Sequence, residues 1–195
     1  MPSDRKTIRQ AVRKQRQQLS LPQRQFTASA LQAHIVKLPL FQQAKHVALY
    51  FSHHNEVDTA PLWQSCCVAG KSCYFPVLIQ SPDKHLIFLP HQEGERLQKN
   101  RYGILEPTVS HDKAIDIFDL DVIFIPLVAF DVRANRLGMG VGYYDRTLIE
   151  VVRQAATEPL LIGLAYEMQK VKQVPMADWD VPMSAVVTEE TVYWR

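Results

Sequence analysis

The sequence predicts an α/β fold: a single three-layer α/β/α domain over residues 1–195, with helices on both faces of a mostly parallel, mixed central sheet. Three observations lead to this prediction. Helix-like and strand-like segments alternate along the chain, the run 121–130 is almost entirely apolar, and a glycine-rich stretch follows that run. With 47% hydrophobic and 22% charged residues, the composition is that of an ordinary globular protein.

The segment 4–19 is predicted to be an amphipathic helix with a basic face. Four cations lie three or four positions apart and so share one side of it: Lys6, Arg9, Arg13 and Arg16. The first 24 residues hold seven Lys or Arg and one Asp, so this segment carries a net charge of +6 and the remainder −4. Such an arm can bind nucleic acid, form a solvated face, or supply cations to the phosphates of a nucleotide, and composition does not choose among these.

The segments after the first helix alternate between helix and strand. A second helix begins with Ser20 as its cap and Pro22 in its first turn, and Phe26 is predicted to face the core. The remaining elements are predicted as strand 46–52, a helix from 59 to Gly70, strands 72–78, 85–90, 121–130 and 160–166, and short closing strands at 185–188 and 192–194. A turn at 81–84 would make strand 85–90 antiparallel, which is why a mixed sheet is predicted.

A glycine-rich loop at 136–146 separates the apolar strand from a helix predicted to begin near Tyr143. Its glycines occupy alternate positions, at Gly138, Gly140 and Gly142. Glycine adopts left-handed torsions readily, so successive N–H groups can turn inward as a nest for anionic oxygens, and the helix start adds its positive end. The loop is expected outside the carboxyl end of a strand, where open α/β sheets bind ligands. An ordinary glycine-rich turn is the alternative, because the spacing is neither the dinucleotide fingerprint nor a Walker loop.

The residues around the glycines favour the interpretation as a phosphate loop. A carboxylate beside a phosphate would repel it unless a cation such as Mg²⁺ lay between them, so Asp145 suggests a metal–nucleotide complex. Positive charge and stacking surfaces in the same small region come from Arg136, Tyr143, Tyr144 and Arg146.

Cysteine content and hydropathy bear on the compartment. Cys66, Cys67 and Cys73 are odd in number and form no Cys-x-x-Cys pair, so they are expected to be reduced thiols. No apolar run approaches the roughly 20 residues that span a bilayer, and the N-terminus lacks the apolar core of a signal peptide. We therefore expect a cytoplasmic protein without a membrane partner. A monomer is the default expectation, because no heptad pattern argues for association.

Taken together, the motifs resemble the 5-formyltetrahydrofolate cyclo-ligase family, whose members are also called methenyltetrahydrofolate synthetases, and the resemblance runs nearly end to end. It is carried by Lys6-x-x-Arg9, Asn55-Glu56, Tyr102-Gly-Ile-Leu-Glu-Pro107, Phe130-Asp131, Arg136-Leu-Gly-x-Gly-x-Gly-Tyr-Tyr-Asp145, and Val174-Pro175 followed by Asp180. The resemblance implies an ATP- and Mg²⁺-dependent enzyme that converts 5-formyltetrahydrofolate to 5,10-methenyltetrahydrofolate with release of ADP and phosphate. The formyl oxygen would be phosphorylated before N10 attacks, so no Ser-His-Asp triad is required, and none is seen.

The resemblance also implies roles for particular residues. ATP would be contacted by Lys6 and Arg9 from the first helix, by Arg136, and by the loop residues Gly138, Met139, Gly140, Val141, Gly142, Tyr143, Tyr144 and Asp145. The catalytic residues would be Lys6, Arg136 and Asp145. The folate would be bound by Glu56, Tyr102, Tyr143 and Tyr144. Mg²⁺ would be bound by Asp145 and Asp180, and Asp178 competes with Asp180 for this role.

Two positions depart from the family's pattern, and two other classes of protein compete with the ligase. Ile8 replaces a common Leu in the first helix, a volume-conserving change that is expected to be harmless. Val141 lies where relatives often carry Gly or Lys, so the loop lacks a possible cation and has less backbone freedom. A phosphosugar isomerase or transferase could use the same loop for a phosphorylated substrate without ATP. A nucleic-acid-binding protein is supported only by the basic first helix, because residues 25–195 are net acidic.

Overall fold

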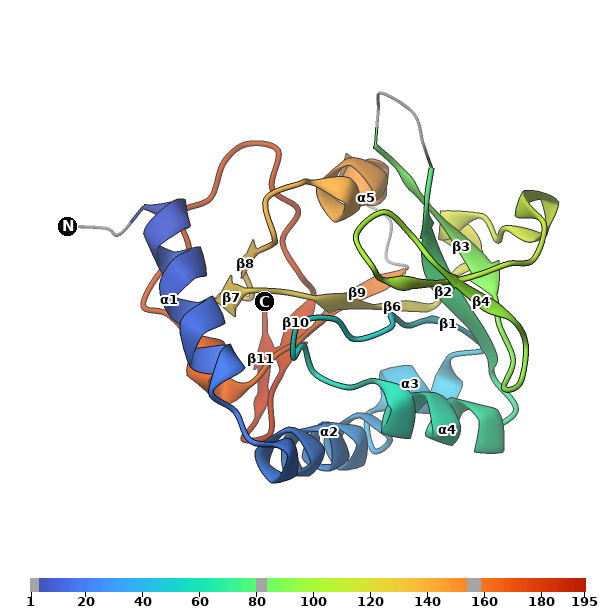
Figure 1. Cartoon of the computed structure of the whole chain (residues 1–195), viewed down its shortest axis with the longest axis horizontal. Helices are drawn as coiled ribbons and strands as arrows, with labels where there is room; N and C mark the ends of the chain where they lie inside the picture. The colour runs from blue at the N-terminus through green and yellow to red at the C-terminus, as the bar shows by residue number, and fades with distance from the viewer. Residues whose placement is uncertain (1–3, 80–83, 154–158) are drawn as a thin grey trace.

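The computed structural model describes residues 4–79, 84–153 and 159–195. Seven strands form one sheet with the order β11-β10-β9-β6-β1-β2-β3 (Figure 1). These strands are β1 (His46–Ala48), β2 (Ser72–Leu78), β3 (Leu86–Pro90), β6 (Val122–Pro126), β9 (Leu160–Leu164), β10 (Ala185–Val187) and β11 (Val192–Trp194). Four neighbouring pairs are parallel, whereas β3 and β11 are antiparallel to their neighbours, which confirms the mostly parallel, mixed sheet. The predicted turn at 81–84 falls, except for Lys84, outside the described residues.

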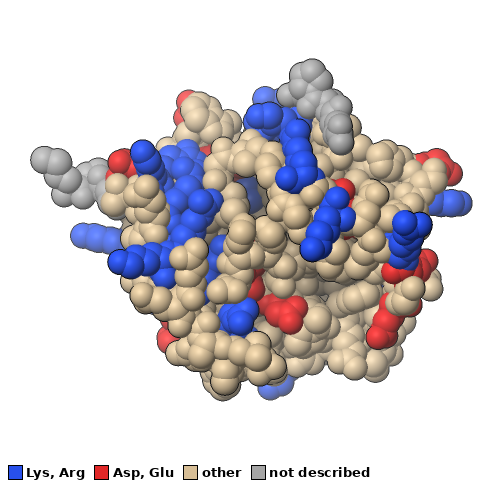
Figure 2. Space-filling model, in the orientation of Figure 1, with Lys and Arg blue, Asp and Glu red and all other residues tan. Residues whose placement is uncertain are grey.

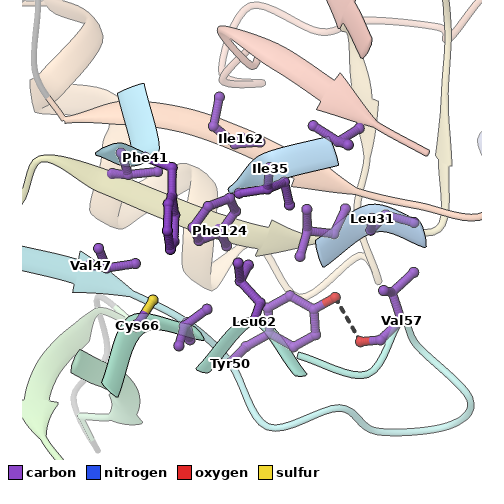
Figure 3. Close-up of a cluster of buried hydrophobic side chains, with 14 of the residues drawn as sticks. Leu31, Ile35, Phe41, Val47, Tyr50, Val57, Leu62, Cys66, Phe124 and Ile162 are labelled. Carbon is purple, nitrogen blue, oxygen red and sulfur yellow. Dashed lines mark hydrogen bonds between the residues drawn. The ribbon is translucent and has the colours of Figure 1, made fainter. Parts of the chain in front are cut away.

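Helices cover both faces of this sheet, as predicted. One face is covered by α2 (Leu21–Ile35), α3 (Pro39–Gln43) and α4 (Ala60–Val68), which lie together below the sheet in Figure 1. Their buried side chains, among them Leu31 and Leu62, pack against Phe124 of β6 (Figure 3). The other face is covered by α5 (Tyr143–Arg153), whose Leu148 packs in a second cluster with Ile123.

The first helix, α1 (Arg5–Gln17), packs on a small ribbon rather than on the central sheet. Ile8 and Val12 are buried against Val128, Ala129 and Leu137. The ribbon consists of the antiparallel strands β7 (Ala129–Phe130) and β8 (Arg136–Leu137). Since β8 leads directly into the glycine-rich loop, this packing brings the N-terminal helix beside a loop more than a hundred residues away.

The apolar run 121–130 was expected to be one strand, and that expectation is wrong. β6 ends at Pro126, and β7 begins at Ala129 in a different sheet. Pro126 has no backbone N–H group, so it cannot donate a hydrogen bond to a neighbouring strand. In the two residues between the strands, the carbonyl oxygens of Leu127 and Val128 accept hydrogen bonds from Nε2 of Gln169 at 2.9 and 2.8 Å. The apolar run therefore turns away from the central sheet and begins the ribbon.

Phe26 was expected in the core, but its side chain is exposed. The inward face of α2 is set by Leu31 and Ile35, and residues three and four positions before Leu31 share that face. Those residues are Thr27 and Ala28, both buried. Phe26, five positions before Leu31, therefore points to solvent.

The remaining elements are short and lie in the connections between the sheet strands. They are the ribbon of β4 (Leu97–Lys99) and β5 (Leu105–Pro107) and the 3₁₀ turns η1 (His111–Lys113), η2 (Ile117–Asp119) and η3 (Glu167–Gln169). The β4–β5 ribbon contacts β2 through Glu106, which accepts a hydrogen bond from the N–H of Leu78. No helix in the described part of the chain is both long and apolar enough to cross a membrane.

Candidate active site

Two cavities share the glycine-rich loop as a common wall. The larger, of about 530 Å³, is lined by several arginines and is called here the basic cavity. The smaller, of about 260 Å³, is lined mainly by apolar and aromatic side chains and is called the apolar cavity. Lining residues common to both are Gly138, Gly140, Val141, Gly142 and Asp145. The apolar cavity lies at the carboxyl edge of the sheet, because its walls include Leu78 at the end of β2 and Pro126 at the end of β6.

The backbone of the loop confirms the predicted use of glycine at two of its three positions. Gly140 has φ +104° and Gly142 has φ +81°, torsions that other residues adopt rarely, whereas Gly138 does not have a positive φ. A Cβ at Gly142 would also lie 3.1 Å from the guanidinium of Arg146, which donates to the Val141 carbonyl. Helix α5 begins at Tyr143, as predicted, so its free N–H groups and positive end lie at the loop.

The basic face of α1 is directed at this loop. Arg9 Nε donates to the carbonyl oxygen of Gly138 at 2.8 Å, and Arg13 Nη2 donates to that of Met139 at 3.3 Å. Arg16 was expected on the same basic face and is buried, with Nη1 donating to the carbonyl oxygen of Leu127 at 3.3 Å. Figure 2 shows Lys and Arg side chains gathered over α1 at the left of the view. Burial, together with the nearby positive charges of Arg5 and Arg13, lowers the pKa of Arg9.

The two residues that begin α1 are placed differently from the sequence expectation. Lys6 is exposed and does not line the basic cavity, whereas Arg5, which was not singled out, does. Arg5 Nη2 also forms an ion pair with Asp180 Oδ1 at 2.8 Å. Arg9, one turn further along the helix, lines the same cavity.

The two aspartates expected to bind Mg²⁺ both line the basic cavity. Asp145 forms an ion pair with Arg136 and accepts the N–H of Val181 at 3.3 Å. Asp180 is buried, and its Oδ2 accepts the N–H of Ala177 at 2.8 Å. Asp178 is exposed and lies outside the cavity.

These two carboxylates suit a divalent cation that is also bound by phosphate and water. Among residues 4–79, 84–153 and 159–195, no three His, Cys, Asp or Glu side chains gather closely enough to hold a metal by themselves. Mg²⁺ beside a nucleotide is usually bound by one or two carboxylates, with phosphates and water as the other ligands. The pair Asp145 and Asp180 fits this kind of site and not a metal site made of protein ligands alone.

Glu56 lines the apolar cavity and is presented by a tight turn after β1. His54 and Asn55 have positive φ values of 49° and 58°, and the Asn55 side chain accepts from Arg24 Nη1 at 3.0 Å. The N–H of His53 donates to Glu56 Oε2 at 3.1 Å. Burial raises the pKa of the Glu56 carboxyl to about 7, although the charge of Arg16 and the hydrogen bond from His53 oppose this shift.

Three predicted tyrosines form an aromatic wall of the apolar cavity. The rings of Tyr102 and Tyr143 meet edge to face, with centroids 6.4 Å apart. Arg101 Nη2 donates to the hydroxyl oxygen of Tyr143, and the guanidinium of Arg136 lies 5.8 Å from the Tyr144 ring centroid. Burial raises the pKa of Tyr144, so its hydroxyl stays protonated at neutral pH.

Several lining residues were missed by sequence reasoning. The basic cavity is also lined by Trp179, which is 68% exposed, and the apolar cavity by the buried Glu106. Glu106 belongs to the 102–107 motif, which was a usable signal, but no role could be attached to it from spacing alone. Trp179 stands next to Asp180, and only the fold shows that both face one cavity.

Asp131, a residue of the Phe130-Asp131 motif, supports the site without lining either cavity. Its carboxylate accepts from the backbone N–H groups of Arg133, Asn135 and Val174 and from the Asn135 side chain, at 2.9 to 3.2 Å. These bonds tie the β7–β8 hairpin, which carries Arg136, to the segment that carries Asp180. The motifs 130–131 and 174–175 are thus in direct contact.

The fold and the cavities define an α/β protein with a glycine-rich loop between two cavities, the arrangement of an enzyme site at the edge of a sheet. The chain belongs to the 5-formyltetrahydrofolate cyclo-ligase family, whose model matches residues 2–189. It is 38% identical to the 5-formyltetrahydrofolate cyclo-ligase of Haemophilus influenzae, over 92% of this chain and 94% of the relative. It is 36% identical to that of Escherichia coli K12, over 93% and 98%. The NMR structure of Aquifex aeolicus 5,10-methenyltetrahydrofolate synthetase superposes with a TM-score of 0.79 at 30% identity, covering 97% of this chain and 92% of that one. The chain is accordingly a ligase of this family.

Proposed function

We propose that the chain converts 5-formyltetrahydrofolate to 5,10-methenyltetrahydrofolate in an ATP- and Mg²⁺-dependent reaction that releases ADP and phosphate. The observation that carries this proposal is the glycine-rich loop that forms a wall of both cavities. A phosphoryl group held by the loop would face both ligands. Transfer from ATP in the basic cavity to a folate in the apolar cavity requires such an arrangement.

The basic cavity is the proposed site of ATP. Arg5, Arg9 and Arg146 surround the loop. Burial, and after it the nearby charges of Arg5 and Arg13, lowers the pKa of Arg9, and a bound polyphosphate would offset the charge repulsion. Lys6 is exposed one turn before Arg9, and its flexible side chain can extend to the phosphates. The backbone of residues 138–142, including Met139 and Val141, would add N–H donors.

The apolar cavity is the proposed site of the folate. Glu56 in its charged form can accept paired hydrogen bonds from the amino-pyrimidine edge of the pterin, which presents adjacent N–H donors. Tyr102, Tyr143 and Tyr144 offer aromatic faces and edges to the flat rings. Apolar side chains such as Leu78 complete a wall that excludes water.

The chemistry requires activation of the formyl oxygen. A formamide is a poor electrophile, so its oxygen first attacks the γ-phosphorus of ATP, ADP leaves, and an N5-iminium phosphate results. N10 then attacks the formyl carbon, and the former formyl oxygen departs with the phosphate. Arg136 lines the apolar cavity, and its guanidinium can neutralise the charge that develops on the transferred group.

Asp145 and Asp180 are the proposed Mg²⁺ ligands, and the position of Asp178 outside the cavity supports the choice of Asp180 over Asp178. Bound there, Mg²⁺ would neutralise phosphate charge beside these carboxylates. Asp145 lines both cavities and forms an ion pair with Arg136. Through this pair it would hold the bound Mg²⁺ in a fixed position relative to the guanidinium that faces the transferred phosphoryl group.

The competing functions account for fewer of these features. A phosphosugar isomerase or transferase would use the loop, but it has no use for a second, aromatic cavity on the other side of it. A nucleic-acid-binding protein would present its basic helix outward, whereas Arg9 and Arg13 donate to loop carbonyl oxygens and Arg16 is buried.

The proposal is tested by following the near-ultraviolet absorbance of the methenyl product with purified protein, 5-formyltetrahydrofolate and Mg²⁺, with and without ATP. The expected result is a rise that requires ATP, that disappears in Asp145→Ala, and that persists in Asp178→Ala as the matched control. A rise without ATP, or no rise with folded wild-type protein, would contradict the proposal.

A further inference from the structure

Glu106 is a buried carboxylate in the wall of the apolar cavity that the proposed function leaves without a role. It lies on β5, and its Oε1 accepts two hydrogen bonds, from the N–H of Leu78 and from Nδ2 of Asn100, both at 2.9 Å. Asn100 in turn accepts from the N–H groups of Tyr102 and Ile104 at 2.9 and 3.1 Å. The carboxylate is thus held in a fixed orientation by a strand end and by an ordered turn.

The described residues donate to only one of the two carboxylate oxygens of Glu106. In the described part of the chain, both hydrogen bonds to Glu106 arrive at Oε1, Oε2 accepts none, and no cation forms an ion pair with this side chain. A buried carboxylate is costly unless donors satisfy it. Since Glu106 lines the cavity, its Oε2 can accept a hydrogen bond from a ligand N–H.

The reaction itself creates a need for a proton acceptor in this cavity. The N10 of 5-formyltetrahydrofolate carries a hydrogen that 5,10-methenyltetrahydrofolate does not, so ring closure must release that proton. When the N10 lone pair attacks the iminium carbon, the C=N5 π electrons move to N5 and N10 becomes a positively charged ammonium. An anilinium-type nitrogen is acidic, so a positioned carboxylate is a strong enough base to deprotonate it.

We propose that Glu106 is the general base that removes the N10 proton during ring closure, an inference that rests on the proposed function. The proton passes to Oε2, and the N–H electron pair stays on N10. The N5 lone pair then re-forms the C=N5 bond, and the C–O bond electrons leave with the phosphate. Glu106 afterwards gives its proton to the departing phosphate or to water, which restores the carboxylate.

The other two carboxylates of the cavity are less suited to this step. Asp145 already forms an ion pair with Arg136, and it faces the basic cavity as well. Glu56 follows β1, whereas Glu106 is anchored to the end of β2, so the two approach a ligand from different strands. If Glu56 binds the pyrimidine edge of the pterin, Glu106 is the carboxylate that would face the other side of the folate, which carries N10.

The test is the Glu106→Gln variant in the ATP-dependent absorbance assay, with kcat and KM determined separately for the folate. Glutamine has the shape of glutamate, and its amide oxygen can keep both bonds to Leu78 and Asn100 while its NH₂ replaces the basic Oε2. The matched control is Glu93→Gln, the same change at an exposed carboxylate that lies outside both cavities. Thermal unfolding of each variant verifies that it is folded.

The proposal predicts that Glu106→Gln lowers kcat by about 100-fold or more, as expected for loss of a general base, with the KM for the folate little changed. Glu93→Gln should retain most of kcat. An unchanged kcat in Glu106→Gln, a rise in KM alone, or an equal loss of kcat in both variants would overturn the role. The wild-type reaction tests the proposed function separately, because its absence would refute that function before any variant is compared.

Discussion

Arg136 and Asp145 form an ion pair that closes the base of the glycine-rich loop. Arg136 comes from β8 and Asp145 from the first turn of α5, so the pair joins the two ends of the loop. The Arg136 side chain is 2% exposed, and its Nε has no hydrogen-bond partner in the described residues. Arg136 also lines the apolar cavity, so the pair places its guanidinium charge in the wall of that cavity.

Lys6 and Lys14 provide a matched test of the proposed contact between α1 and ATP. Both are exposed on this helix, but Lys6 lies one turn before Arg9, which lines the basic cavity, whereas Lys14 lies beyond it near the end of the helix. We expect Lys6→Ala to raise the KM for ATP about tenfold, the equivalent of one charged hydrogen bond, and Lys14→Ala to leave it unchanged. Steady-state kinetics at low salt measures the difference, and equal effects of the two changes would show that only general charge matters.

Asp180 and Asp178 allow the metal site to be tested at neighbouring positions. Asp180→Asn keeps the size of the side chain and removes its charge from the basic cavity. We expect the Mg²⁺ concentration for half-maximal rate to rise by about 10- to 100-fold in Asp180→Asn, within the range found for metal-site substitutions. Asp178→Asn is the control and should require the same Mg²⁺ concentration as the wild type. An equal rise of this Mg²⁺ concentration in both variants would contradict the assignment of Asp180 to the metal site.

Glu56 makes folding stability depend on pH in a defined direction. Its pKa is raised from 4.5 to about 7, so the folded state binds a proton that the unfolded state releases between these values. The stability that Glu56 contributes is therefore full below pH 4.5 and is lost as pH rises through 7, by at most about 3 kcal/mol. We expect the Glu56→Gln variant to gain in unfolding free energy relative to wild type between pH 5 and pH 8.

Chemical denaturation of both proteins across this range measures that gain. A difference between the two that stays constant with pH would show that Glu56 is ionised throughout. The same ionisation should act in the opposite sense on binding, because the charged carboxylate is the form that accepts the paired hydrogen bonds of the pterin. The KM for the folate should accordingly fall as pH rises through 7 in the wild type and stay flat in Glu56→Gln.

Trp179 is expected to bind the base of the nucleotide. An indole that is 68% exposed in the wall of a basic cavity offers a stacking surface, and stacking of a base on an aromatic side chain is worth about 1–3 kcal/mol. Trp179→Ala should raise the KM for ATP about tenfold or more, and Trp179→Phe should restore most of the affinity. Trp194, exposed on β11 and outside both cavities, provides the control.

Tripolyphosphate has phosphates but no base, so it can bind the phosphate loop without stacking on Trp179. Its inhibition of the enzyme therefore distinguishes a loss of base stacking in Trp179→Ala from a change in the shape of the cavity. Its inhibition constant should be the same in Trp179→Ala as in the wild type. A parallel loss of tripolyphosphate binding would mean that the substitution had disturbed the phosphate loop, and the assignment of Trp179 to the base would be wrong.

Local features of the site could be predicted from the sequence because they depend on torsions and spacing. The left-handed torsions at Gly140 and Gly142 and the start of a helix at Tyr143 follow from glycine's missing Cβ and from the pattern of the residues after it. The mostly parallel sheet likewise follows from the alternation of helices and strands. These features require no knowledge of which distant segments meet.

Features that depend on distant contacts could not be predicted. Helical spacing put Arg16 on a basic face but could not show that this end of the face is buried beside Leu127. The break after Pro126 arises because Gln169, far along the chain, takes the next two carbonyl groups. The placement of Trp179 also depends on how its segment docks, since nothing near it in the sequence indicates a cavity.

The central claim is that a phosphoryl group passes across the glycine-rich loop from ATP to the formyl oxygen. The most direct measurement uses 5-formyltetrahydrofolate labelled with ¹⁸O in the formyl group and mass analysis of the inorganic phosphate released with the methenyl product. The account predicts that the phosphate carries the ¹⁸O label, because the formyl oxygen leaves bound to phosphorus. Label released as water, with unlabelled phosphate, would contradict it.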